Sequence, residues 1–439
     1  MRHATPPVCA TLVIFLSLFV AAPGRAGAPV QEAKLLASDG AAQDEFGWQL
    51  AVDGNTTIIG APGASVIGAA YVFTRSSMRW TQQAKLTPVD PEPDGLFGSS
   101  VALDGGTAVI GARGHDDNGA DSGAAFVFVL SGGIWTEHAK LLPADGAAGD
   151  SFGGSVALDG DTAVVGARQH GQNGINSGAA YVFTRSAGSW AEQAKLVPED
   201  GDPADFFGVS VALDGDTALI GAFWDEPSGF RSGSAYVFTR SGESWTQQAK
   251  LVASDGATFE QFGQRVALRD DTAIIAAPGH PVTELTPGSA YVFTRTVTLW
   301  TEDDNLTPAD GVDGDGFGWS VATDGTTAVI GSVFNDTPLN TGSVYVFDNS
   351  NGSWTQQDKL LADDGAPGDG FGSSVALDAN TVVSGAPADD DNGFQSGSAY
   401  VFLLPQGVPA IGGSGIALLL LAVLGTGTYF TRRTRSYRS

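Results

Sequence analysis

The hydrophobic and polar positions of this chain recur with a fixed long period. Residues 152–167, FGGSVALDGDTAVVGA, are typical of a stretch that appears in seven similar copies. Each copy is marked by a Phe-Gly pair, and successive pairs lie 51 to 55 residues apart. Self-similarity of this period indicates stacked copies of one structural unit. The phenylalanines of the seven pairs are Phe46, Phe97, Phe152, Phe207, Phe262, Phe317 and Phe371.

Within each copy the pattern predicts four β-strands. In the third copy these are residues 155–158 (SVAL), 162–167 (TAVVGA), 179–184 (AAYVFT) and a segment that begins at Trp190 (WAEQAKLV). The first two are joined by Gly160-Asp161, which suits a two-residue hairpin with a positive φ. The second and third strands are apolar on both faces, whereas the fourth alternates. The fourth strand is therefore expected at an edge, with one face in water.

Lysines support that order of strands. Six copies place a lysine at the same position of the fourth strand, and Asn305 occupies it in the remaining copy. Lysine on an exposed edge discourages strands of other molecules from pairing there. The six residues are Lys34, Lys85, Lys140, Lys195, Lys250 and Lys359.

The two ends of the repeat region complement each other. Residues 31–40, QEAKLLASDG, read as a fourth strand without its first three, and residues 397–405, GSAYVFLLP, read as a third strand without its fourth. Together they complete one unit, and closure of a ring removes exposed sheet edges. The sequence thus predicts an all-β, seven-bladed β-propeller of four-stranded antiparallel blades, closed by the N-terminal strand. Residues 29–404 form this single domain.

These residues resemble a known family. The Phe-Gly pair, the SVAL strand and the endings IIGAP (residues 58–62) and SGAP (384–387) look like the FG-GAP repeat of integrin α-subunit heads and many bacterial exported proteins. The resemblance implies a seven-bladed propeller that acts in adhesion or recognition outside the cell. Many such repeats carry a calcium loop between the first two strands, but here residues 159–162 (DGDT) are too short to supply six to eight oxygen ligands. The chain is most similar to the bacterial variant without that loop.

Charge narrows the range of partners. The chain has 49 acidic and 22 basic residues, for a net charge of −27. Six of the arginines lie in residues 1–28 and 405–439, which contain no Asp or Glu, so the repeat region is more acidic than the whole chain. Nucleic acids and anionic membrane surfaces would repel such a body. We therefore expect no nucleic-acid partner.

Both terminal segments read as targeting signals. Residues 1–28 have a basic start, an apolar run and small residues before a cleavage point, which predicts a secretory signal peptide. The one cysteine, Cys9, would leave with it. Residues 405–439 contain an apolar stretch, 411–430, followed by arginines, which predicts a transmembrane helix with a cytoplasmic tail; a buried C-terminal helix is the alternative. This end also resembles Gram-negative sorting signals, although Ala410 and Ile411 stand where Glu-Pro would follow Val408-Pro409.

The long loops of such a propeller share one face, and they carry two acidic sets. The first recurs at the start of most copies, and we expect it to cap turns and backbone amides. The second lies in two loops between second and third strands and offers the oxygen donors that Ca²⁺ prefers. The first set is Asp39, Asp44, Asp145, Asp150, Asp200, Asp205, Asp310, Asp315, Asp364 and Asp369. The second, the candidate metal ligands, is Asp116, Asp117, Asn118, Asp389, Asp390, Asp391 and Asn392.

Residues that break the repeat are better guides to a specific site. In the fourth copy, Phe223, Trp224 and Asp225 replace a small or polar stretch. An aromatic ring beside carboxylates suits contact with a sugar or a peptide, although Trp224 could instead pack locally on Phe230. Trp48 and Trp319 follow their Phe-Gly pairs and are expected at the mouth of the central channel.

No catalytic motif of the HExxH, GxSxG, P-loop or CxxC type occurs. The four histidines of the repeat region, His115, His138, His170 and His280, are interpreted as scattered, without a shared spacing. We expect an exported, cell-surface-associated and monomeric propeller, attached to the membrane by its C-terminal helix, that binds an extracellular protein or glycan through the long-loop face. Two alternatives remain open. One is a polysaccharide- or cell-wall-acting hydrolase or lyase that uses loop carboxylates, and the other is a purely structural surface module.

Overall fold

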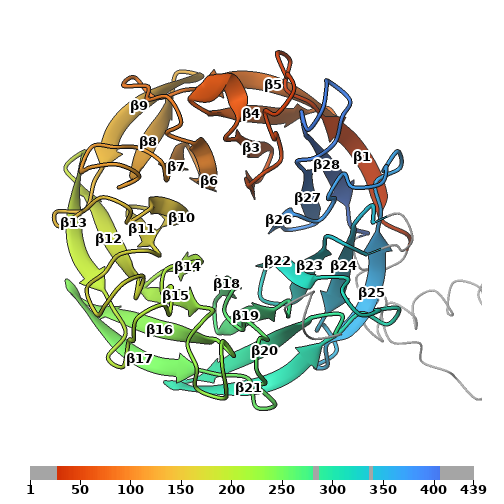
Figure 1. Ribbon diagram of the computed structural model, residues 1–439. Coiled ribbons are helices and arrows are strands. Elements are labelled where there is room, and N and C mark those ends of the chain that lie inside the picture. The colour runs from red at the N-terminus through yellow and green to blue at the C-terminus, as the bar shows by residue number, and fades with distance from the viewer. Residues whose placement is uncertain (1–26, 280–285, 336–339, 406–439) are drawn as a thin grey trace, which may run out of the picture. The chain divides into compact units, whose positions relative to one another are not determined.

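The computed structural model describes residues 27–279, 286–335 and 340–405. In these residues 28 strands form seven four-stranded sheets, arranged as the blades of a wheel around a channel (Figure 1). Residues 28–404 make one compact unit. The predicted seven-bladed propeller of antiparallel blades is confirmed.

Six blades consist of consecutive strands. Blades one to three are β2(Leu50–Asp53), β3(Thr56–Ala61), β4(Ala69–Ser76), β5(Arg79–Leu86); β6(Phe97–Asp104), β7(Thr107–Ala112), β8(Ala124–Ser131), β9(Ile134–Leu141); and β10(Phe152–Asp159), β11(Thr162–Ala167), β12(Ala179–Ser186), β13(Ser189–Leu196). Blades four to six are β14(Val211–Asp214), β15(Thr217–Ala222), β16(Ser234–Ser241), β17(Ser244–Leu251); β18(Arg265–Arg269), β19(Thr272–Ala277), β20(Ser289–Thr296), β21(Leu299–Leu306); and β22(Phe317–Thr323), β23(Thr327–Ser332), β24(Ser343–Asp348), β25(Thr355–Leu360). A 3₁₀ turn, η1(Ala64–Val66), follows β3.

The seventh blade is built from both ends of the propeller. It contains β26(Ser374–Asp378), β27(Thr381–Ala386) and β28(Ser398–Leu403), and its outer strand is β1(Val30–Leu35). β1 pairs antiparallel with β28, from Val30 opposite Leu403 to Leu35 opposite Ala399. The inner strand β26 contacts β2 of the first blade, so the ring closes as predicted (Figure 1).

The outer strands differ from the simple alternation that the sequence suggested. In each blade the ladder between the third and fourth strands contains one extra residue, so that Val182 pairs with Ala194 while Phe183 pairs with Glu192. The extra residue, Gln193 in this blade, forms a β-bulge, which bends the strand and shifts its side chains. Its amide oxygen accepts a hydrogen bond of 2.9 Å from the indole of Trp245 in the next blade. The bulge therefore turns an edge residue into a contact between blades.

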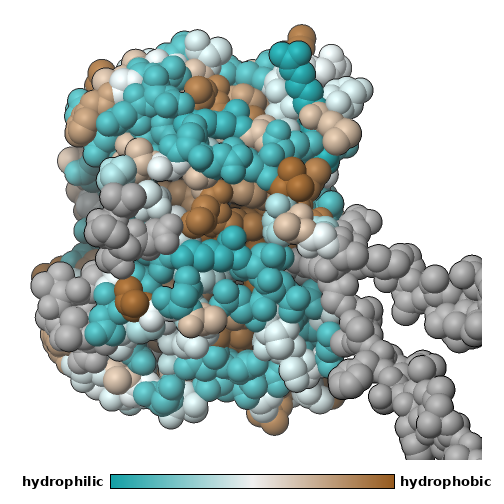
Figure 2. Space-filling view, turned by 90° about the vertical axis from the view of Figure 1, so that its right-hand side faces the viewer, coloured by the Kyte–Doolittle hydropathy of each residue, from teal (hydrophilic) through white to brown (hydrophobic). Residues whose placement is uncertain are grey.

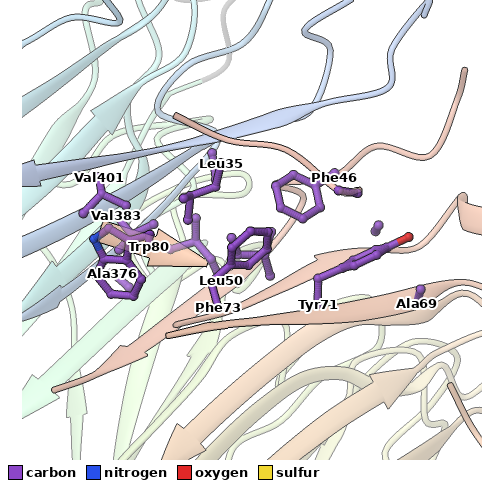
Figure 3. Packing of buried hydrophobic residues seen from close by; sticks show 14 of the residues in the cluster. Leu35, Phe46, Leu50, Ala69, Tyr71, Phe73, Trp80, Ala376, Val383 and Val401 are labelled. Atoms are coloured by element: carbon purple, nitrogen blue, oxygen red, sulfur yellow. The ribbon is translucent and has the colours of Figure 1, made fainter. Parts of the chain in front are cut away.

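The phenylalanine of each Phe-Gly pair is a buried wedge between blades. Phe46 is fully buried and packs edge-on against Tyr71 and Phe73 of its own blade, with ring centroids 5.5 and 5.9 Å apart. Its cluster also contains Val383 and Val401 of blade seven (Figure 3). The same two ring contacts recur in all seven blades, at 5.4–5.6 Å and 5.8–6.0 Å. Burial of these rings in every joint explains why the pair recurs.

The glycine of the pair is required by backbone geometry. Gly153 has a φ of +82°, and a Cβ atom there would lie 2.2 Å from the carbonyl oxygen of Ala124 in the preceding blade. At Gly111, near the end of the preceding blade's second strand, a Cβ atom would likewise lie 1.9 Å from the carbonyl oxygen of Gly153. Neighbouring blades thus touch backbone to backbone, which only glycine permits.

Hydrogen bonds join every pair of adjacent blades at the rim. Where the chain leaves one outer strand, a backbone N–H donates to a Gln or Glu side chain on the outer strand of the next blade, at 2.7–3.0 Å. The bond from Asp363 N–H to Gln31 belongs to this set and joins blade six to the N-terminal strand. Near the channel, Ser374 donates across the closing joint to the carbonyl of Gly47 at 2.8 Å.

The short hairpins lie on the opposite end of the blades from the long loops. Gly160 has the predicted positive φ, +56°, and its N–H donates to Asp104 of the preceding blade at 2.5 Å. On the side of the wheel that Figure 2 presents, polar residues predominate and the apolar ones form small groups. In the ranges that the structure describes, no helix has the length and apolar character to cross a membrane. The predicted signal peptide, apart from residues 27–28, and the predicted span 411–430 lie outside those ranges.

Candidate functional site

The long loops of neighbouring blades pack together on one face, as the antiparallel order requires. In the loop that enters blade one, the N–H groups of Gln43 and Glu45 donate to the carbonyls of Phe394 and Gln395 in blade seven, at 2.8 and 3.1 Å. The corresponding loops of blades three and four are joined in the same way. Because the residues that vary between blades lie in these long loops, they are gathered on this one face.

The first acidic set is engaged in repeated contacts within this face. In five of the loops the first aspartate accepts a hydrogen bond from a buried tyrosine and pairs with the lysine of the outer strand: Asp39 accepts from Tyr71 at 3.0 Å and from Lys85 at 2.7 Å. In the other two, Phe126 replaces the tyrosine and Asn305 replaces the lysine. The hydrogen bond from Lys85 lowers the pKa of Asp39, against an opposing effect of burial. The lysine also lies 5.2 Å from the centre of the Tyr71 ring. The edge lysines are thus part of a Tyr–Asp–Lys cluster.

The second aspartate of each loop caps a turn, as expected. Asp44 accepts a hydrogen bond from the N–H of Ala41 at 2.9 Å, and Asp150 does so from Ala147 at 2.8 Å. The equivalent bonds occur for Asp205, Asp315 and Asp369. The second aspartates of the set therefore cap turns, whereas the first aspartates bind tyrosine and lysine side chains instead.

A third residue position, which the sequence pattern had not indicated, contributes to this cluster. His115, His170 and His280 are separated by multiples of 55 residues, so the histidines are not scattered, contrary to our expectation. In blade three His170 lies 2.8 Å from Asp150 and 2.7 Å from Lys195. The same position holds Asp225, Asn335 and Asp389 in other blades. Counting from the Phe-Gly pairs would have revealed it. His280 lies outside the described residues.

The candidate calcium residues are engaged in contacts within the protein. Asp389 is buried and lies 2.9 Å from Lys34, which also pairs with Asp391 at 2.7 Å. Asp117 pairs with Lys140, and Asp390 accepts from the N–H of Gln395. Asp116 accepts from the N–H of Asp121, and the N–H groups of Asn118 and Asn392 donate to serines. Among the described residues, no three Asp, Glu, His or Cys side chains are grouped so that they could hold a metal ion.

Two of the blade-four candidates, Trp224 and Asp225, border a pocket of about 450 Å³ on the long-loop face, whereas Phe223 does not line it. Trp224 lies under the guanidinium of Arg231, 3.6 Å from the ring centre, and meets the ring of Phe206 edge-on at 4.7 Å. Phe223 packs against the same two rings, while Phe230 meets Phe259 edge-on at 5.2 Å. The pocket walls include Asp200, Asp202, Asp205, Trp224, Asp225, Glu226, Phe230, Arg231 and Lys250.

Two carboxyl groups of this pocket have contrasting surroundings. Asp225 pairs with Lys250 at 2.7 Å and accepts from Tyr236 at 2.9 Å. Asp205 is buried, and burial, together with the nearby charges of Asp225 and Asp202, raises its pKa to about 7. A carboxyl group that titrates near neutral pH beside a pocket is typical of a functional site, although structural clusters also produce such shifts.

The channel mouth contains the two tryptophans that were expected there. Trp48 and Trp319 line a hollow of about 420 Å³ with Phe334, and Trp319 meets Phe334 edge-on at 5.6 Å. A second hollow of about 200 Å³ lies inside the channel and shares Trp48 and Gln49 with the first. Residues of several blades line both hollows, and the inner one is lined largely by the repeated Ser-Val pair of the first strands.

Comparison with known proteins identifies the repeat. A profile of the FG-GAP repeat matches residues 29–73, 80–128, 135–183, 190–238, 245–293, 300–347 and 354–402. The chain belongs to the FG-GAP repeat family. Among solved structures, Sqt1 of Saccharomyces cerevisiae is similar at 11% identity, covering 87% of this chain and all of that one with a TM-score of 0.48. No match was found among curated proteins.

Each matched FG-GAP repeat is offset from a blade by one strand. The match over residues 80–128 begins in β5, the outer strand of blade one, and ends in β8, the third strand of blade two. The sequence repeat therefore spans a joint between blades. This explains why the Phe-Gly pair, which fills that joint, is central to the family pattern.

Three channel residues of the FG-GAP repeats went unnoticed in the sequence. Arg113, Arg168 and Arg265 line the inner hollow. Each replaces a residue type that recurs at its position: other repeats have Pro62 or Pro387 where Arg113 and Arg168 stand. The departure from the repeat is visible in the aligned copies, but only the closed ring brings the three side chains to one hollow.

Proposed function

We propose that this protein is an exported, surface-attached binding module that recognises an extracellular protein or glycan through the long-loop face. The propeller supplies a rigid support on which variable loops meet, and binding residues commonly lie on such loops. Export and attachment rest on the terminal sequence patterns described above. A purely structural module would not need a pocket that departs from the repeat.

The observation that carries this proposal is the pocket of blade four. Its aromatic residues depart from the repeat, since Gly63, Gly114 and Gly279 stand where Trp224 does. The indole nitrogen of Trp224 is buried and has no hydrogen-bond partner among the described residues. An unmet buried donor costs about 1–3 kcal/mol, so the surroundings of Trp224 are not arranged for stability alone. Carboxylates around it provide acceptors for sugar hydroxyls or for a cationic side chain.

The test is binding of the full-length protein to an immobilised glycan panel and to candidate surface proteins. The Glu226→Gln and Trp224→Ala variants should lose binding by tenfold or more, on the order of 1.4 kcal/mol. Leu299→Ala is the matched control, because Leu299 is an exposed apolar residue at a hairpin on the other end of the blades. Equal binding by all variants would place the partner elsewhere.

One observation favours the second candidate, a polysaccharide-acting hydrolase or lyase. Asp205 has a pKa near 7 and neighbouring carboxylates, and a general acid needs a pKa close to the working pH. Turnover of a polysaccharide that is abolished in Asp205→Asn, with binding retained, would establish an enzyme. Saturable binding without turnover supports the binding module.

A further inference from the structure

Three arginines of the channel stand apart from the other cations of the propeller. Arg113 follows β7, Arg168 follows β11, and Arg265 opens β18, so they come from blades two, three and five. At the position of Arg265 four other blades have a serine, Ser100, Ser155, Ser320 or Ser374, that donates to the carbonyl of the next blade. Arg265 gives up that bond between blades and places a guanidinium in the channel instead.

The three guanidinium groups have no carboxylate partner. Several other arginines are paired: Arg185, Arg240 and Arg295 each lie 2.5–2.7 Å from an aspartate. Within the described ranges, Arg113, Arg168 and Arg265 form no ion pair. This is unusual in a repeat region with so many Asp and Glu residues.

Their polar atoms are only partly satisfied. Arg265 donates from one terminal nitrogen to the backbone carbonyl of Gln264 at 2.9 Å. The Nε of Arg113 is buried without a partner. Glu45 lies near enough to Arg113 for the positive charge to affect its pKa. Burial raises the pKa of Glu45, and the charge of Arg113 opposes that rise. A guanidinium has five donors, so most of the hydrogen-bonding capacity of this cluster is open to the hollow.

The arginines also repel one another. Burial lowers the pKa of the Arg265 guanidinium to about 10, and the charge of Arg168 contributes. Burial likewise lowers the pKa of Arg168, with a contribution from Arg113. A guanidinium with a pKa of about 10 is still charged at neutral pH. Holding like charges together destabilises the empty channel, and an anion between them would relieve that repulsion.

The hollow has the size and walls for a small molecule. The arginines line the inner space of about 200 Å³, and Arg265 also borders the outer, mostly apolar space of about 420 Å³. Trp48 lies on both, and Trp319 and Phe334 line the outer one. A ligand could therefore place one end among guanidinium groups and the other against indole rings.

We propose that the channel mouth is a binding site for a small carboxylate, with the carboxylate held by Arg113, Arg168 and Arg265 and an apolar or sugar body on Trp48 and Trp319. Arginine forks match carboxylate geometry, and tryptophan provides area for a sugar or apolar ring. The site is separate from the blade-four pocket. Repulsion by the acidic body acts over distances that physiological salt screens, whereas contacts inside the hollow are screened much less.

The experiment uses the full-length protein at constant ionic strength, with glucuronate, benzoate and inorganic phosphate as probes and glucose and chloride as references. We expect glucuronate or benzoate to raise the Tm and to bind saturably by calorimetry, and glucose and chloride to do neither. Phosphate that binds as tightly as both carboxylates would overturn the carboxylate assignment. Failure of both carboxylates to bind would overturn the site.

The variants are Arg265→Ser, which copies the residue of other blades, and Arg113→Gln/Arg168→Gln. Each should weaken carboxylate binding at least tenfold while raising the Tm of the unliganded protein, because repulsion is removed. The matched control is Arg269→Gln, at the other end of β18, which makes the same charge change and should leave binding unchanged. Unchanged binding in the channel variants, or a lower Tm without ligand, would show that these arginines serve packing. Glu226→Gln should leave carboxylate binding unchanged. A failure of the channel site can therefore be distinguished from a failure of the blade-four pocket.

Discussion

The ammonium nitrogen of Lys34 lies 2.9 Å from a carboxylate oxygen of Asp389, 355 positions further along the chain. Lys34 is on β1, and Asp389 lies just beyond the end of β27, so the pair joins the N-terminal strand to the last blade. Burial acts to raise the pKa of Asp389, but the hydrogen bonds from Lys34 and the Asp391 amide hold it below its ordinary value. The ion pair is therefore formed within a largely buried cluster.

Lys34→Met should lower the free energy of unfolding by about 3 kcal/mol, because it leaves the buried Asp389 charge without its cation. Lys85→Met is the control. Its partner, Asp39, is half exposed, so a loss of about 1 kcal/mol or less is expected. Chemical denaturation of both variants measures the difference. Equal losses would mean that Lys34 does not hold the closing strand.

Replacement of the wedge phenylalanine tests the joints between blades. Phe152→Ala should cost roughly 3–5 kcal/mol, since it opens a cavity between blades two and three. Phe230→Ala serves as control because Phe230 is 48% exposed, and it should cost no more than about 1 kcal/mol. A small loss for Phe152 would contradict its position in the core.

Two glycines with positive φ should respond differently to alanine. In Gly153→Ala the new Cβ would collide with the backbone of Ala124, so the joint must open, at a cost of several kcal/mol. At Gly160 a Cβ meets nothing within 4 Å, and blade seven already has Ala379 at this place with a φ of +51°. Gly160→Ala should cost about 1 kcal/mol. Comparable melting temperatures for the two variants would argue against the backbone contact.

Asp205 makes stability depend on pH. Its pKa rises from 3.8 in the unfolded chain to about 7 in the folded protein, so the folded state binds the extra proton between these values. Stability contributed by this group is therefore present at low pH and is lost as the pH rises through 7. Asp205→Asn should raise the free energy of unfolding at pH 8 by roughly 2–4 kcal/mol and change it little at pH 4. The same gain at both pH values would be inconsistent with a raised pKa.

Calcium tests the acidic loops. Asp389 and Asp391 already pair with Lys34, and calcium requires six to eight oxygens. We expect the same Tm in calcium and in EDTA. A calcium-dependent rise in Tm that disappears in Asp389→Ala/Asp391→Ala would instead assign a metal to the loop.

The sequence was sufficient to predict the ring of blades but not the contacts between outer strands or the residues that line the channel. The period, the unpaired strands at both ends and the Phe-Gly pairs are local patterns, and they predicted the blades and their closure. The bulge at Gln193 was not predictable, because its extra residue is set by pairing with another strand and by the indole of Trp245. Arg113, Arg168 and Arg265 look like isolated substitutions in sequence. They become a cluster only because three blades converge on one axis.

The position of β28 has a mechanical consequence. This last strand is not at an edge, since it is bonded to β27 on one side and to β1 on the other. A pull on the chain after Leu404 would therefore load two ladders at once instead of unzipping a strand held along a single side. If the C-terminal segment is the tether, as proposed, drag or shear from the surroundings would reach the propeller through a strand that is bonded on both sides.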